Sequence, residues 1–199
     1  MKHLKMLGLA LVAVAALMAF AGSASAAPTL TSPTGTEYTG ALTLTLSSSL
    51  LVKAVFANQT CTGSTMSDNI ATDDEAHAKG PITTLTFSNC GTNDVTPLKN
   101  ADGTYGWLTI NQKGEVFGSN TRITFLNTST GTHCIYGSTT NTKLGTLTPS
   151  SATGGTAVLD ISASLPYYPE SLSSQFICGS TETWSGTYTV TTPDVLNLG

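Results

Sequence analysis

Two adjacent tyrosines are the residues whose type and spacing best suit ligand binding. Tyr167 and Tyr168 lie between Pro166 and Pro169, which indicates an exposed loop. Aromatic faces stack on the apolar faces of sugar rings, so this pair predicts a carbohydrate- or small-ligand-binding site. Two other aromatic pairs fall within alternating runs, which indicates core positions instead. These pairs are Trp107 with Tyr105 and Trp184 with Tyr188.

Two histidines are the possible general bases of a secreted hydrolase, a function that we keep as an alternative. A Ser-His-Asp arrangement would use His77 or His133. His77 lies in a polar stretch that indicates a solvated loop, and His133 lies in a predicted strand. The motifs G-x-S-x-G, S-x-x-K and H-E-x-x-H are absent, and no spacing singles out two carboxylates as a glycosidase pair. We therefore predict no catalytic residue and no enzyme activity.

The one concentration of charge is acidic and comprises Asp68, Asp73, Asp74 and Glu75. Hard cations such as Ca²⁺ take several oxygen ligands on a bendable loop. The spacing of these residues does not fit the calcium-loop pattern D-x-[DN]-x-[DN]-G, so a solvated loop is the favoured interpretation. We predict no metal site and no cofactor.

The N-terminal residues have the pattern of an export signal. Lys2 and Lys5 precede an apolar run of 16 residues at 6–21, and the sequence A-S-A at 24–26 is a cleavage signature. The run is shorter than the roughly 20 residues of a membrane-spanning helix. We predict a signal peptide at residues 1–26 and a mature domain at 27–199 without a membrane span, secreted or associated with the cell surface.

All four cysteines lie in the predicted mature part, and an even number in an exported chain indicates disulfides. Four cysteines allow three pairings, and sequence alone does not choose among them. We favour Cys61 with Cys90 and Cys134 with Cys178, which are 29 and 44 positions apart. A metal site is disfavoured because no C-x-x-C spacing occurs.

Alternation of apolar and hydroxyl side chains is the strongest structural signal in the chain. Leu42, Leu44 and Leu46 alternate with threonines, and similar patterns recur at 85–87, 123–125, 157–163 and 183–191. These patterns predict half-buried strands. We therefore expect an all-β domain of about nine or ten short strands, with an antiparallel β-sandwich as the favoured architecture and a barrel as second choice.

Three further segments complete the predicted organisation. Residues 27–37 resemble an extended lead-in, and residues 192–199 resemble a frayed tail. The best helical candidate is 73–79, which Gly80-Pro81 would end after about two turns.

Composition excludes several classes of function. Without residues 1–26, six basic side chains face twelve acidic ones, a formal net charge of −6. No basic stripe is present to neutralise phosphates, so we expect no nucleic-acid partner. The chain contains 36 Thr and 21 Ser, and 40% of its residues are hydrophobic with only 10% charged, which argues against global disorder.

Several segments together resemble a paralogous group of uncharacterised secreted bacterial β-proteins. The landmarks are the opening at 1–5, C-T-G-S-T at 61–65, L-T-F-S-N-C at 85–90, T-K-L-G-T-L-T at 142–148 and W-S-G-T-Y-T-V-T at 184–191. In layout the chain is more distantly similar to exported activators of alkane oxidation. The resemblance implies an extracellular β-protein associated with the cell surface or matrix. It implies no reaction, and it brings no catalytic or ligand residue with it.

The function that we expect is that of a secreted or surface-associated, non-catalytic β-protein acting by display or binding toward an extracellular ligand or surface component. Two further possibilities are weaker. Threonine-rich faces suggest ice binding, but the threonine runs are irregularly spaced. Polymerisation by strand exchange through the C-terminal run is disfavoured beyond Thr192 by Pro193, which cannot donate to a strand ladder.

Overall fold

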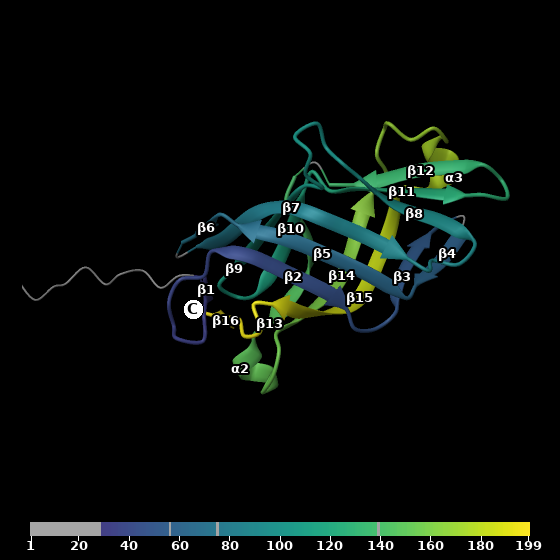
Figure 1. The fold of residues 1–199 in the computed structure, drawn as a ribbon. Helices are drawn as coiled ribbons and strands as arrows, with labels where there is room; N and C mark the ends of the chain where they lie inside the picture. The colour runs from purple at the N-terminus through teal and green to yellow at the C-terminus, as the bar shows by residue number, and fades with distance from the viewer. Residues whose placement is uncertain (1–28, 56, 75, 139) are drawn as a thin grey trace, which may run out of the picture.

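The fold is known from a computed structural model, which describes residues 29–55, 57–74, 76–138 and 140–199 (Figure 1). The predicted export signal at 1–26 lies outside these residues. Eight antiparallel strands close into a barrel, because β14 pairs with β13 on one side and with β15 on the other. Around the barrel, the strands are β14 (Val158–Pro166), β13 (Thr142–Thr148), β10 (Glu115–Ser119), β9 (Trp107–Asn111), β7 (His77–Ser88), β5 (Gly63–Ile70), β2 (Gly40–Leu46) and β15 (Thr181–Thr192).

The predicted all-β class is confirmed, but the favoured β-sandwich is wrong and the second choice, a barrel, is found. The reason is the length of β15. One edge of this strand pairs with β14, while the other edge pairs with β3 and then with β2. Closure removes the sheet edges that an open sandwich would leave, and it uses both edges of the C-terminal run. Strand exchange through that run would therefore have to open the barrel.

Strands outside the barrel raise the number of β-elements in the described chain to sixteen, above the predicted nine or ten. A hairpin extends the sheet beyond β15, and a separate three-stranded sheet, with the order β12-β11-β8, lies at one end of the barrel (Figure 1). The additional strands are β1 (Leu30–Thr31), β3 (Leu50–Ala54), β4 (Ala57–Cys61), β6 (Thr72–Asp73), β8 (Asn93–Leu98), β11 (Arg122–Asn127), β12 (Thr132–Gly137) and β16 (Asn197–Leu198).

The two ends of the domain are tied together, which corrects the prediction of a free lead-in and a frayed tail. Strand β1 pairs with β16, and Leu196 is fully buried just before β16 begins. The carboxylate of Asp73 also accepts hydrogen bonds from the backbone N–H groups of Thr29 and Leu30. Sequence missed this pairing because each strand is only two residues long.

The predicted helical segment at 73–79 is also wrong, since β6 and the first part of β7 occupy it. Strand β7 runs through Gly80-Pro81 without a break. A Cβ on Gly80 would lie 2.1 Å from Oδ1 of Asp68, so this glycine allows a close approach of side chain to backbone and does not end a helix. The two helices of the described chain lie elsewhere and have four residues each. They are α2 (Ser150–Thr153) and α3 (Gln175–Cys178).

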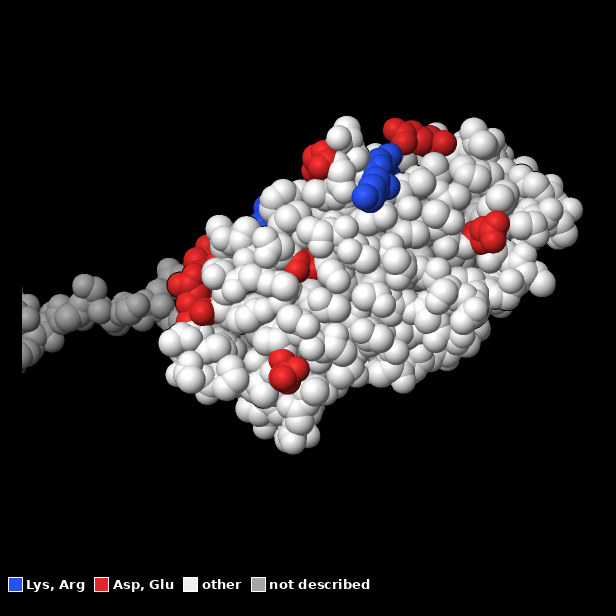
Figure 2. Space-filling model, in the orientation of Figure 1, with Lys and Arg blue, Asp and Glu red and all other residues white. Residues whose placement is uncertain are grey.

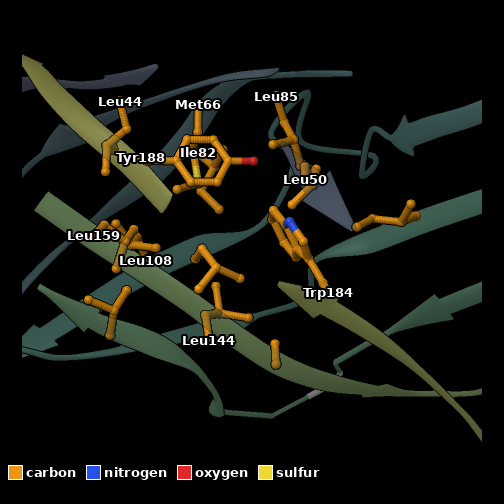
Figure 3. Packing of buried hydrophobic residues seen from close by; sticks show 14 of the residues in the cluster. Leu44, Leu50, Met66, Ile82, Leu85, Leu108, Leu144, Leu159, Trp184 and Tyr188 are labelled. Atoms are coloured by element: carbon orange, nitrogen blue, oxygen red, sulfur yellow. The ribbon is translucent and has the colours of Figure 1, made fainter. Parts of the chain in front are cut away.

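The barrel is filled by the apolar half of each alternating strand, with hydroxyl groups facing outward. Trp184 and Tyr188 of β15 point into this core among leucine, isoleucine and methionine side chains (Figure 3). Trp184 packs edge-on against Phe87, with ring centroids 5.8 Å apart. The hydroxyl of Tyr188 is satisfied by Ser64, 2.8 Å away. The core positions predicted from alternation are thus found for Trp184 and Tyr188, whereas Trp107 and Tyr105 are only partly buried.

Both favoured disulfides are present. Cys61 is bonded to Cys90 and joins β4 to the connection between β7 and β8, whereas Cys134 is bonded to Cys178 and joins β12 to α3. All four sulfurs are therefore paired. In the chain-entropy model, each closure raises the free energy of unfolding by about 4 kcal/mol as an upper limit.

Two carboxyl groups face the barrel interior, and among the described residues neither has a well-formed hydrogen bond. Asp68 follows Met66 on the inward face of β5 and is 2% exposed, and Glu182 precedes Trp184 on the inward face of β15 and is 0% exposed. Burial disfavours the charged form and raises the pKa of Asp68 to about 8 and that of Glu182 to about 8. Both groups are therefore mostly protonated in the folded protein at neutral pH.

We predict that stability falls as the pH rises from about 5 to 8. In this window the folded state retains two protons that the unfolded chain, with carboxyl pKa values near 4, has released. The free energy of unfolding, measured by urea denaturation, should fall by several kcal/mol and level off once the pH exceeds the folded-state pKa values near 8 by about one unit. The double variant Asp68→Asn with Glu182→Gln should show a much flatter profile. A wild-type stability that rises over this window would contradict the assignment.

Candidate functional site

The connection between the two strands that close the barrel carries the candidate site. It comprises residues 167–180, contains α3 and is called the strap here. The strap leaves the end of β14, runs beside β12 and returns to β15 (Figure 1). The disulfide between Cys134 and Cys178 joins its C-terminal part to β12, and the hydroxyl of Tyr136 donates to the backbone carbonyl of Cys178. The strap is therefore fixed at its far end as well as where it leaves the barrel.

Hydrogen bonds hold the first half of the strap along the edge of β12. The backbone N–H of Tyr168 donates to the carbonyl of Ile135, and that of Ser173 donates to the carbonyl of His133. In return, the backbone N–H groups of His133 and Ile135 donate to the hydroxyls of Ser173 and Ser171, at 3.0 and 2.8 Å. The strap thus satisfies the backbone of β12 much as another strand would.

Tyr167 and Tyr168 line one groove of about 520 Å³ together with Gly137, Pro166, Pro169 and Glu170. Both rings are partly exposed. Tyr167 is held in place because its hydroxyl donates to the carbonyl of Ser173, 3.1 Å away. Gly137 supplies a wall without a side chain, since a Cβ there would lie 2.3 Å from the carbonyl oxygen of Thr121. A mostly apolar groove with a few polar groups is the usual form of a small-ligand site.

Arg122 organises the polar side of this groove. Its Nη1 donates to Oε2 of Glu170 at 2.9 Å, and its Nη2 donates to Oδ1 of Asn100 at 3.1 Å and to the carbonyl of Lys99 at 3.3 Å. The guanidinium also lies 5.5 Å from the ring centroid of Tyr168, a cation–π contact. The side chain of Arg122 is 17% exposed, whereas that of Glu170 is 64% exposed. Glu170 is therefore the charged group that a ligand would meet.

Neither histidine is placed as the base of a hydrolase among the described residues. His77 and Asp74 line a hollow of about 230 Å³, but the bond between them runs from the His77 backbone N–H to Oδ1 of Asp74. Nδ1 of His133 is buried without a partner, and the nearby hydroxyl of Ser173 accepts from the His133 backbone. The hydrolase alternative gains no support from these groups.

The acidic segment is not the solvated loop that sequence predicted. Asp68 lies inside the barrel, and Asp73 is buried where it accepts backbone N–H groups of β1. Only Asp74 is exposed, and the backbone N–H groups of Ala76 and His77 hold the pKa of its carboxyl below the usual range. Glu75 lies outside the described residues. Nowhere in the described chain do three or more His, Cys, Asp or Glu side chains come together as metal ligands.

Threonines on four neighbouring strands line up across the outer wall of the barrel. Thr86, Thr65, Thr45 and Thr189 are register partners across β7, β5, β2 and β15. The face that contains these strands is largely uncharged, with a few separate acidic groups and most of its charge toward the edges (Figure 2). Sequence spacing did not reveal this row, because it depends on register between strands. A barrel wall is twisted, whereas ice binding needs a flat array, so the tyrosine groove remains the stronger candidate.

A second hollow lacks the features of the tyrosine groove. It has a volume of about 440 Å³ beside α2 and is lined by serine, glycine and threonine with Asp194, Val195 and Asn197. No aromatic side chain lines it. Among the described helices, none has the length and apolar character needed to cross a bilayer.

Sequence analysis predicted the two tyrosines but missed their partners. Arg122 and Glu170 are 48 residues apart, and Gly137 belongs to a third segment. The chain contains a single arginine, and this was the only signal that could have drawn attention to Arg122. Of the other aromatic candidates, Trp107 is half-buried with Lys79 over its ring, 5.3 Å from the centroid, and does not contribute to the groove.

Comparisons with protein-family models, with curated proteins and with solved structures found no match to this chain. We therefore infer function from the geometry of the groove.

We predict that the disulfide between Cys134 and Cys178 keeps the strap against β12. In the variant with both cysteines replaced by serine, the amides of the strap should exchange with deuterium faster than those of the barrel, as measured by mass spectrometry of peptides. The matched control replaces Cys61 and Cys90 by serine, which opens a loop of similar length elsewhere. Equal protection of the strap in the two variants would show that hydrogen bonds alone position it.

Proposed function

We propose that the protein acts outside the cytoplasm as a non-catalytic binding protein whose tyrosine groove takes a sugar or a similar polyhydroxylated ligand. The observation that carries this proposal is the pairing of two partly exposed tyrosine rings with one exposed carboxylate in a single groove. Apolar faces of a sugar ring would pack on the tyrosines, and its hydroxyls would donate to Glu170.

The size and rigidity of the groove support this proposal. A volume of about 520 Å³ lies within the range of roughly 300–1,000 Å³ typical of small-ligand sites. The strap that forms most of its lining is fixed by a disulfide and by hydrogen bonds to β12. A groove that is already formed loses less conformational entropy when it binds a ligand.

Two observations support a location outside the cytoplasm. All four cysteines are paired in disulfides, which persist in oxidising compartments. The pattern of residues 1–26 also predicts an export signal, and the sequence resemblance to secreted bacterial β-proteins agrees with it. In this proposal, the protein is a secreted or surface-associated binding module of that kind.

Loss of the Tyr168 ring should weaken sugar binding about tenfold or more, the effect of removing one central aromatic contact. The measurement screens the protein against a panel of immobilised oligosaccharides and then titrates the best ligand against wild type and Tyr168→Ala. Tyr168 suits this test because, within the described part of the chain, its hydroxyl makes no hydrogen bond that holds the strap, unlike that of Tyr167.

The matched control is Phe176→Ala, which removes an aromatic ring from the same strap. Phe176 is 97% exposed and does not line the groove, so this variant should bind like wild type. Equal losses in the two variants, or no binding to any member of the panel, would contradict the proposed function.

A further inference from the structure

We infer that the groove selects neutral sugars over acidic ones, and that Glu170 determines this selectivity because it forms an ion pair with Arg122. The inference rests on the proposed function and names the class of ligand for the same groove. It makes Glu170 a specificity-determining residue.

Arg122 is the cation that an acidic sugar would bind, but three hydrogen bonds already engage its two terminal nitrogens. Nη1 is bonded to Oε2 of Glu170, and Nη2 is shared between Asn100 and the backbone of Lys99. Recognition of a carboxylate by arginine typically uses two parallel N–H donors. A uronic acid could obtain this geometry only by displacing at least one of these partners, and Glu170, whose side chain is 64% exposed, is the one that a ligand would meet.

The side chain of Lys99, whose backbone carbonyl contacts Arg122, is directed elsewhere. The ammonium of Lys99 lies over the ring of Tyr105, 5.4 Å from its centroid. Tyr105 does not line the groove. Lys99 thus contributes its backbone carbonyl to Arg122 without presenting its charge beside Tyr168.

Glu170 presents negative charge and a free acceptor to the groove. Among the described residues, only its Oε2 is hydrogen-bonded, which leaves Oε1 to accept from a ligand hydroxyl. The same carboxylate would repel an acidic sugar, and like charges at an interface suppress the wrong partner. The Arg122–Glu170 pair therefore favours hydroxyl donors and disfavours anions.

The test titrates neutral hexasaccharides of glucose, galactose and mannose, together with their counterparts in which each C6 hydroxymethyl group is oxidised to a carboxylate. Wild type should bind its best neutral hexasaccharide at least about tenfold more tightly than the oxidised form. In Glu170→Gln, the freed charge of Arg122 should attract the carboxylates and reduce this ratio by about tenfold.

The control is Glu115→Gln, which neutralises the acid of the other ion pair, 2.7 Å from Nζ of Lys143, and should keep the wild-type ratio. Wild-type binding of both forms with equal affinity, or an unchanged ratio in Glu170→Gln, would overturn the selectivity while leaving sugar binding intact. Absence of binding to all six hexasaccharides would instead overturn the proposed function and this inference with it.

Discussion

The structure depends on the pairing of β14 with β15, which closes the barrel. Because β15 has twelve residues, it also pairs with β3 and then with β2 along its other edge. The same pairing places the end of β14 beside the start of β15, so the strap must leave and re-enter at one end of the barrel. That end lies next to the three-stranded sheet, whose strand β12 then holds the strap. The position of the groove is thus a consequence of barrel closure.

Different interactions stabilise the barrel and shape the groove. The barrel relies on apolar burial, and it tolerates two unpartnered carboxyl groups because burial keeps them protonated. The groove relies on a disulfide, backbone hydrogen bonds and one arginine whose side chain is 17% exposed. Since the disulfide and the backbone hydrogen bonds fix the strap, its exposed side chains can vary with little effect on the fold. Binding surfaces on loops that a rigid scaffold positions commonly have this property.

Local sequence patterns predicted the strands, the turns and the tyrosine pair. Contacts between distant segments could not be predicted from such patterns. Alternation shows which face of a strand is buried but not whether the first and last strands of a sheet meet, so it favoured a sandwich. Asp68 and Glu182 are in phase with buried neighbours. This signal was present in the sequence, but Asp68 was assigned to a solvated loop and Glu182 was not singled out. The ion pair between Arg122 and Glu170 leaves no pattern in the local sequence, because it depends on how β11 and the strap pack against each other.

The central claim is that ligand binds at the strap and not on the threonine-rich wall of the barrel. Amide chemical shifts of isotope-labelled protein, followed during titration with the neutral hexasaccharides, test this claim most directly. We expect the amide chemical shifts of Gly137, Tyr168 and Glu170 to change, while those of Thr45 and Thr65 remain unchanged. Shifts confined to the threonine row, or no shifts at saturating sugar, would contradict it.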